Sequence, residues 1–148
     1  MRGKGVLAAA LLALLTACAG PSTPTAGEGQ PTEELIGTYW KLMTLDGRDV
    51  AVVEDQREAH MVLDTQGRVT GSTGCNRLVG SYTLDGRELH FSPIASTRMA
   101  CPGEAATLER DWTAALARTA RVEQAGKRLR LIDADGQTLA ELKANALY

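Results

Sequence analysis

The stretch GSYTLDGRELHFSPI, from Gly80 to Ile94, decides the fold class of this 148-residue chain. Two runs of alternating apolar and polar residues flank Asp85-Gly86-Arg87. An Asp-Gly pair between such runs is the strongest short-range signal for a β-hairpin, because the tight turn needs a positive φ that glycine adopts freely. Alternation places four residues on the buried face of this hairpin: Tyr82, Leu84, Leu89 and Phe91.

Similar turn sequences recur along the chain. Asp46-Gly47, Gln66-Gly67 and Asp135-Gly136 each separate two further runs of strand-forming residues. Three Asp-Gly turns and one Gln-Gly turn argue for an antiparallel, meander-like sheet. The strand candidates cover residues 38–45, 58–64, 69–73, 127–133 and 137–142, and their expected core residues are Trp40, Leu42, Met61, Leu63, Leu129, Leu131 and Leu139.

One segment has the period of a helix. In residues 101–120, Pro102 suits the first helical turn, where a missing N–H costs nothing. An apolar stripe at helical spacing runs through Leu108, Trp112, Ala115 and Leu116, while Glu109, Arg110 and Arg118 point outward. Trp112 is interpreted as a core anchor of this helix. The predicted fold class is α+β, a curved, mostly antiparallel, barrel-like sheet with one packed α-helix, and periodicity does not decide between an open sheet and a closed barrel.

The N-terminus predicts export and lipidation. Arg2 and Lys4 precede an apolar run that is too short to span a bilayer as a mature helix. Leu15-Thr16-Ala17-Cys18 resembles a bacterial lipobox, in which the cysteine is acylated, by palmitate among other chains, and the signal is removed before it. We therefore expect a signal peptide at 1–17, lipidated Cys18 with a flexible linker at 18–34, and a domain at 35–148. An ordinary secretory signal with an incidental cysteine is the alternative, and a transmembrane anchor is a third.

The charge pattern restricts the partners. The chain has 16 basic and 18 acidic residues. Removal of Arg2 and Lys4 leaves 14 against 18, a formal charge of −4. The remaining Lys and Arg residues are spread along the sequence and form no long basic run, which argues against nucleic-acid binding and against adhesion to anionic lipid by charge. We expect acylation to hold the protein at a membrane of the cell envelope, facing the periplasm, and at the outer membrane if the source is Gram-negative.

Two cysteines remain after Cys18. Cys75 and Cys101 form an even pair in an exported protein, which predicts a disulfide; two free structural thiols are the alternative. A nucleophilic cysteine needs a histidine base, and neither His60 nor His90 has a special context. A zinc site from these four residues lacks the usual ligand spacing. The sequence predicts no catalytic residues, no metal and no cofactor.

The neighbourhood of the two cysteines resembles a known family. The pieces Gly74-Cys75-Asn76-Arg77, Gly80-Ser81-Tyr82 and Thr97-Arg98-Met99-Ala100-Cys101, in this order and followed by a helix, are similar to the META/HslJ domain family. The resemblance runs from about residue 36 to 142. It implies a small α+β domain in the cell envelope, a loose association with heat or stress response, and no enzymatic activity. The motif positions carried over as a structural signature are Gly74, Cys75, Asn76, Arg77, Gly80, Tyr82, Thr97, Met99 and Cys101.

The sequence thus predicts a lipid-anchored, non-enzymatic binding module related to stress tolerance or envelope maintenance. Its expected partners are the membrane, through the N-terminal lipid, and an envelope protein. The alternative is a carrier of a small apolar ligand inside the barrel-like sheet, and an enzyme comes third. A carrier needs an internal cavity, whereas a protein-binding module needs a filled core and an exposed apolar patch or sheet edge.

Overall fold

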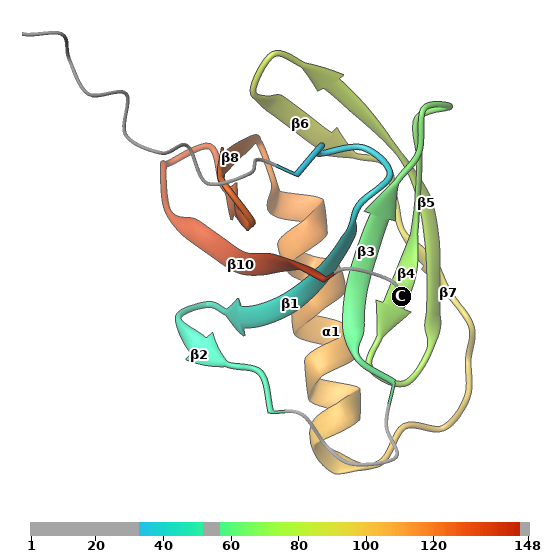
Figure 1. Ribbon diagram of the computed structural model, residues 1–148. Coiled ribbons are helices and arrows are strands. Elements are labelled where there is room, and N and C mark those ends of the chain that lie inside the picture. The colour runs from blue at the N-terminus through green and yellow to red at the C-terminus, as the bar shows by residue number, and fades with distance from the viewer. Residues whose placement is uncertain (1–32, 52–56, 146–148) are drawn as a thin grey trace, which may run out of the picture.

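A computed structural model describes residues 33–51 and 57–145 (Figure 1). The predicted signal peptide, Cys18 and most of the linker lie outside the described residues. The described part forms a sheet and one helix. Their bounds are β1 (Tyr39–Leu45), β2 (Arg48–Asp49), β3 (Ala59–Leu63), β4 (Arg68–Thr73), β5 (Arg77–Asp85), β6 (Glu88–Phe91), β7 (Ala95–Ser96), α1 (Gly103–Arg118), β8 (Arg121–Ala125), β9 (Arg128–Ile132) and β10 (Thr138–Asn145).

The sheet closes into an antiparallel barrel. Its strand order is β10-β9-β8-β6-β5-β4-β3-β1, and β1 pairs with β10 to complete the ring. The eight-stranded barrel confirms the expected α+β class and settles the choice between an open and a closed sheet. One seam is short: β6 and β8 share the single pair Glu88–Arg121. Two backbone hydrogen bonds, Leu89 N–H to Ala120 O (3.1 Å) and Val122 N–H to Arg87 O (2.9 Å), hold this seam.

Each of the four predicted turns joins two antiparallel strands, although the strand after Asp46-Gly47, β2, was not among the predicted ones. Asp46 and Gly47 have φ angles of 47° and 74°, the two positive values that a two-residue hairpin turn needs. The turns at Gly67, Gly86 and Gly136 also carry a glycine with positive φ. They connect β3 to β4, β5 to β6 and β9 to β10.

Strand β8 was not expected from the sequence. Its five residues contain one buried apolar side chain, Val122, so that alternation gives almost no signal. The short strands β2 and β7 were missed for the same reason, since two residues cannot show a period.

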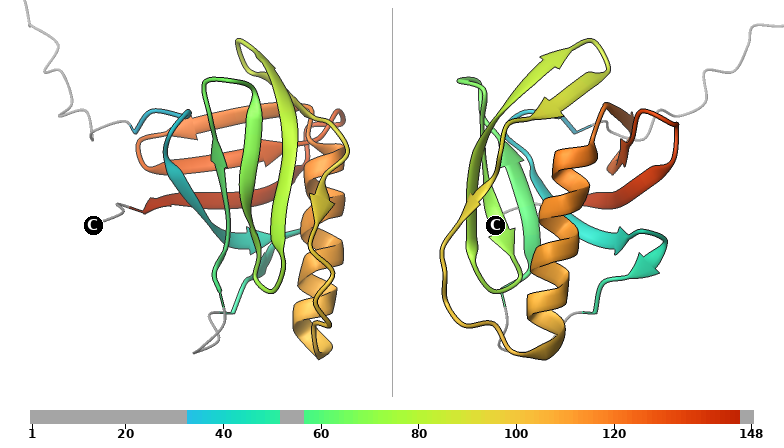
Figure 2. Two further views of the ribbon diagram at one scale, coloured as in Figure 1. Left: turned by 90° about the vertical axis from the view of Figure 1, so that its right-hand side faces the viewer. Right: turned by 180° about the vertical axis from the view of Figure 1, so that it is seen from behind.

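Helix α1 lies between two groups of strands (Figure 2). It contacts β1 and β10 in one group and β4 and β6 in the other. It begins after Pro102, which is the extended N-cap residue and not part of the first turn. Trp112 and Leu116 are fully buried, and Leu108 is half-buried against the core. The expected core positions on the strands are buried, except for Leu84 and Phe91, which are half-buried at its margin.

Strands β3 and β4 approach each other closely at Gly71. A Cβ atom at this position would lie 2.1 Å from the carbonyl oxygen of His60, which is closer than any real contact. Gly71 therefore permits the β3–β4 pairing that brings the following turn, residues 74–76, toward α1.

Candidate functional site

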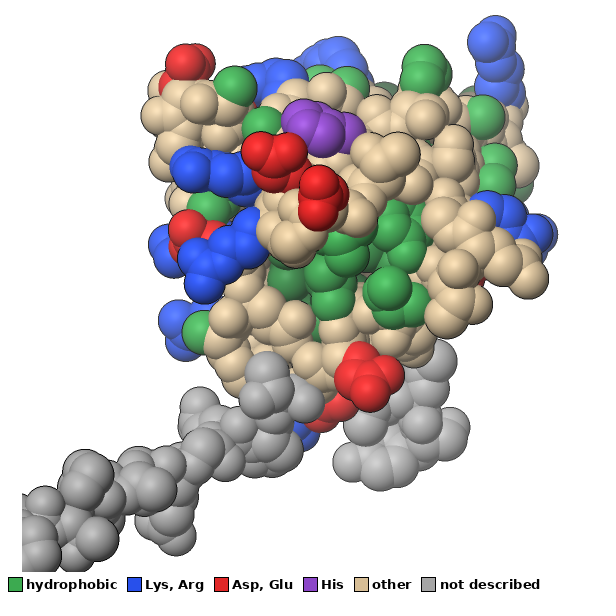
Figure 3. Space-filling model, turned by 90° about the horizontal axis from the view of Figure 1, so that it is seen from above, with side chains coloured by type: hydrophobic (Ala, Val, Ile, Leu, Met, Phe, Trp, Pro, Cys, Tyr) green, Lys and Arg blue, Asp and Glu red, His purple; other side chains and the backbone are tan. Residues whose placement is uncertain are grey.

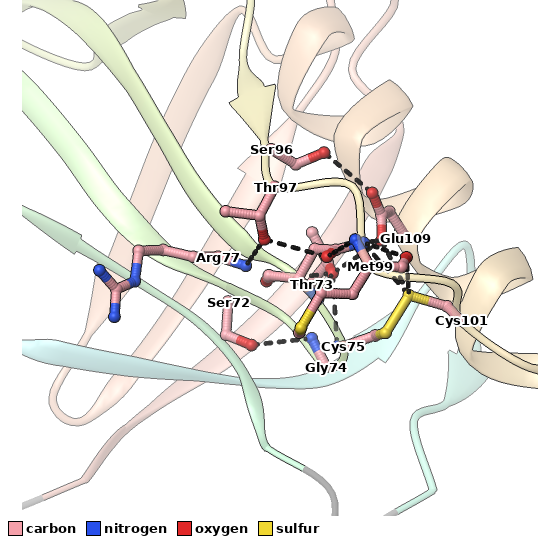
Figure 4. Close-up of a disulfide and its surroundings, with 11 residues drawn as sticks. Ser72, Thr73, Gly74, Cys75, Arg77, Ser96, Thr97, Met99, Cys101 and Glu109 are labelled. Atoms are coloured by element: carbon pink, nitrogen blue, oxygen red, sulfur yellow. Dashed lines mark hydrogen bonds between the residues drawn. A yellow bond between two sulfur atoms is a disulfide. The ribbon is translucent and has the colours of Figure 1, made fainter.

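A disulfide joins the β4–β5 turn to the segment that enters α1 (Figure 4). Cys75 and Cys101 have an S–S distance of 2.02 Å and a Cα–Cα distance of 6.0 Å. The pair expected from the sequence is thus bridged, and the alternative of two free thiols is not observed. We call this region, with Thr73, Asn76, Ser96, Thr97, Met99 and Glu109, the disulfide junction.

The turn that presents Cys75 is fixed by its own side chains. The Oγ atom of Ser72 accepts a hydrogen bond from Gly74 N–H (3.0 Å), and Oγ1 of Thr73 accepts one from Asn76 N–H (2.9 Å). Gly74 has a φ of 96°, which an L-residue with a side chain rarely adopts. The glycine and the two hydroxyl residues therefore set the direction of Cys75.

Asn76 connects the turn to residues 97–101. Its Oδ1 accepts hydrogen bonds from Oγ1 of Thr97 and from the backbone N–H of Met99, both 2.9 Å long. Its Nδ2 donates to the Met99 carbonyl (3.3 Å), to Sγ of Cys101 (3.2 Å) and to Oε2 of Glu109 (2.7 Å). Asn76 is 3 % exposed, so these contacts replace water almost completely. Asn76 thus has a structural role larger than the local turn expected from the sequence.

Glu109 receives three hydrogen bonds from three strands or turns. Oε1 accepts from Oγ of Ser96 (2.9 Å), while Oε2 accepts from Asn76 and from Oγ1 of Thr73 (3.2 Å). Among the described residues no cation forms a salt bridge with Glu109. The expectation that Glu109 simply points outward was wrong, because hydroxyl and amide donors of the sheet surround its carboxylate. Helical periodicity predicted a polar, outward position for Glu109 but does not predict its hydrogen-bond donors.

A surface hollow of about 460 Å³ lies beside the disulfide junction. Residues 94–101 form one wall, and the face of α1 that carries Glu109 and Thr113 forms the other. Met99 borders it and is 56 % exposed, the highest value among the large hydrophobic side chains described. The hollow therefore combines a polar floor with an exposed apolar side chain on a fixed segment.

The other motif positions have structural roles. Arg77 is exposed, and its backbone N–H donates to Oγ1 of Thr97 (3.0 Å). A Cβ atom on Gly80 would lie 2.7 Å from Cδ1 of Ile94, so this glycine makes room for residues leading to the junction. Tyr82 donates a 2.5 Å hydrogen bond to the Asp64 carbonyl, and burial, followed by the Asp64 charge, raises the pKa of Tyr82.

The histidines lie elsewhere. The ring of His60 stacks on Tyr39 with a centroid distance of 4.1 Å, and burial lowers the pKa of His60. Burial and the nearby Glu58 carboxylate raise the pKa of Tyr39 to about 12. His90 is exposed on β6. In the part of the chain that the structure describes, no group of three or more His, Cys, Asp or Glu side chains could hold a metal ion.

The model of the META domain family matches residues 33–146. The chain belongs to the META domain family. It is also similar to two proteins solved by NMR. One, from Burkholderia xenovorans, has 25 % identity and a TM-score of 0.60 over 86 % of this chain and 98 % of that one. The other has 26 % identity and a TM-score of 0.57 over 72 % of this chain and 87 % of that one.

No curated protein matches the sequence. The whole disulfide junction lies inside the matched META domain, and this domain is not a known enzyme family. Among the helices described, none is long and apolar enough to cross a membrane.

Proposed function

We propose that this META domain is a lipid-anchored binding module of the cell envelope, which binds another protein through the surface of the disulfide junction. The observation that carries the proposal is the position of Met99. Its side chain is exposed, while its backbone N–H and carbonyl are both hydrogen-bonded to the buried Asn76. An apolar side chain on a pre-ordered segment is typical of a binding surface, because little conformational freedom is lost when the partner docks.

The disulfide supports the same role. Cys75–Cys101 and the Asn76 contacts hold residues 97–101 against the β4–β5 turn from two sides. Protein-binding surfaces are enriched in methionine and arginine, and Arg98 and Met99 occur together on the rim of the hollow.

An interior ligand, the alternative expected from the sequence, has less support. Two tryptophans and nine aliphatic or methionine side chains are fully buried in the described core. Two surface hollows lined by described residues lie beside α1, one at the junction and one of about 640 Å³ near β1 and β2. A filled core and a surface hollow favour a surface partner over an apolar ligand inside the barrel.

A photo-crosslinking amino acid at position 99 tests the binding surface. The protein is expressed in its own envelope, and Thr83, exposed on β5 away from the junction, carries the same amino acid as the control. We expect one discrete adduct from position 99 and none from position 83. Equal adducts from both positions, or none from position 99, would contradict the proposal.

The stress-related role is tested by deleting the gene and measuring survival under heat stress. We expect survival to fall, to be restored by the wild-type chain, and not to be restored by Met99→Asp.

Lipidation is tested separately at Cys18. In the wild-type chain we expect incorporation of labelled palmitate and recovery with the membrane fraction. Cys18→Ala removes the acceptor thiol, so the precursor stays unprocessed or the protein becomes soluble. Labelled palmitate on Cys18→Ala equal to that on the wild-type chain would show that Cys18 is not the acceptor.

A further inference from the structure

Basic residues that are far apart in the sequence form a row across four neighbouring strands. The register pairs Arg128 of β9 with Lys143 of β10, Lys143 with Lys41 of β1, and Lys41 with His60 of β3. Directly opposed residues share one face of a sheet and lie about 5 Å apart at their Cα atoms. The side chains belong to the outer face, since Arg128 and Lys143 are exposed, and we call them the cation row.

The neighbouring row on the same strands has a different composition. There Glu123 of β8 faces Arg130 of β9, and Arg130 faces Glu141 of β10. Arg130 also forms a salt bridge of 2.5 Å with Glu123. Like charges directly opposite each other destabilise a sheet, whereas opposite charges stabilise it. The row of Glu123, Arg130 and Glu141 therefore alternates in charge, whereas the adjacent cation row contains only basic residues.

Only part of the cation row is neutralised. Lys41 forms a 2.5 Å salt bridge with Glu58. Burial lowers the pKa of His60, so that its ring carries little charge at neutral pH. Within residues 33–51 and 57–145, no carboxylate forms a salt bridge with Arg128 or Lys143. Among the described residues these two exposed cations have no carboxylate partner, which leaves them to an external anion.

Glu33, the first residue that the structure describes, lies beside this row. Lys127, which precedes Arg128, forms a 3.7 Å salt bridge with Glu33, the first residue described. Gln124 of β8 donates a hydrogen bond to the Glu33 carbonyl. Figure 3 shows Lys and Arg side chains, with Asp and Glu side chains among them, along one side of the molecule. Lys41 and Lys143 belong to the row, and Lys127 directly precedes its Arg128.

The sequence positions of these residues argued against adhesion to anionic lipid by charge, but the strand register brings the residues together on one face. We propose that the cation row docks on anionic phospholipid headgroups of the membrane to which the N-terminal chain leads. The inference rests on the proposed anchoring for the position of the membrane. Cys18 precedes Glu33 by 15 residues, a stretch that spans at most about 50 Å, so the bilayer cannot lie farther than this from Glu33. The rest of the domain is net negative, so an anionic surface repels its other faces. The row would thus orient the domain.

The experiment uses the chain from residue 18 onward, with Cys18→Ser and an N-terminal hexahistidine that anchors it to nickel-chelating lipids. This anchor keeps the linker and does not depend on lipidation, so a failure of lipidation and a failure of the row are distinguishable. Arg110→Lys adds a reference lysine on the exposed side of α1. Vesicles of phosphatidylcholine alone are compared with vesicles that also contain phosphatidylglycerol. Mass spectrometry follows acylation of Lys143 relative to the lysine introduced at position 110.

On the anionic vesicles we expect the ratio of the Lys143 acylation rate to the rate at position 110 to fall about fivefold compared with the neutral vesicles. This factor corresponds to the free energy that one basic residue gains near an anionic surface. About 1 M salt should remove the protection, because the Debye length is then about 3 Å. Arg128→Gln should reduce it, whereas Arg130→Gln, on the same strand but in the charge-matched row, should not. Equal rates on both kinds of vesicle would overturn the proposal. Protection by soluble polyphosphate but not by the vesicles would assign the row to an anionic polymer instead.

Discussion

The side-chain amide of Asn76 donates a 2.7 Å hydrogen bond to the Glu109 carboxylate, and so joins the β4–β5 turn to the middle of α1. The disulfide makes a second connection from the same turn, to the segment before the helix. Two different bonds therefore tie the β4–β5 turn to the helical side of the molecule: the disulfide of Cys75 and the charge-assisted hydrogen bond of the next residue, Asn76. The position of α1 on the barrel, and of the hollow beside it, depends on both.

Glu109→Gln should lower the free energy of unfolding by about 1–3 kcal/mol, the usual contribution of hydrogen bonds to a charged group. The substitution keeps the shape of the side chain, but it replaces one acceptor oxygen by a donor that faces the donors of the sheet. Glu104→Gln, at an exposed position of the same helix, is the matched control and should change little. Urea denaturation measures both. Equal effects would show that the Glu109 contacts do not stabilise the fold.

Loss of the disulfide should lower the free energy of unfolding by about 3.5 kcal/mol, the chain-entropy value for a separation of 26 residues. The measurement compares Cys75→Ser/Cys101→Ser with the parent chain, both carrying Cys18→Ser. Reduction of the parent under denaturing conditions should also expose two thiols to a mass tag. If both thiols react in the native, unreduced protein, the bridge is absent from the protein in solution.

Much of the fold follows from patterns within short stretches of sequence. Alternation identified Met61 and Leu63, and the number of cysteines suggested the bridge. Strand β8 lacked such a pattern, because Val122 is its one buried apolar residue. The partners of Glu109 come from three separate places in the chain, so no local period predicts them. The cation row depends on strand register across the closed barrel, which periodicity left undecided.

The two buried tryptophans should respond differently to substitution by phenylalanine. Trp40 donates a 2.9 Å hydrogen bond to the Leu35 carbonyl, whereas Nε1 of Trp112 has no partner among the described residues. Both side chains are fully buried, so the loss of ring volume is similar. Trp40→Phe should therefore lower the free energy of unfolding by about 1 kcal/mol more than Trp112→Phe. Urea denaturation decides, and a larger loss for Trp112→Phe would be the contrary result.

Gly71→Ala should be severely destabilising. The added Cβ would lie 2.1 Å from the His60 carbonyl oxygen, a backbone atom that cannot move without disturbing the β3–β4 pairing. Overpacking of this kind costs about 3 kcal/mol or more. Gly86→Ala is the comparison, since its new Cβ meets no atom within 4 Å and the positive φ of 59° costs about 1 kcal/mol. Thermal unfolding of the two variants should place Gly71→Ala well below Gly86→Ala.

Acid should destabilise the protein through two aspartates in similar turns. Asp64 accepts hydrogen bonds from the backbone N–H groups of Gln66 and Arg68, and Asp133 accepts them from Asp135 and Gln137. The backbone bonds from Arg68 and from Gln137 are the largest causes that hold the two carboxyl pKa values below their ordinary range.

A lowered pKa means that the folded state favours the carboxylate. The resulting stability is fully present above the ordinary aspartate pKa of about 3.9 and is lost as the pH falls through the lower folded-state pKa. Urea denaturation between neutral pH and about pH 3 should therefore show a shallower pH dependence for Asp64→Asn and Asp133→Asn than for the parent. Arg118→Gln removes only the 3.1 Å ion pair with Asp133 and should keep most of the dependence, because the backbone donors remain. A parent-like slope in both asparagine variants would mean that other carboxyl groups control acid unfolding.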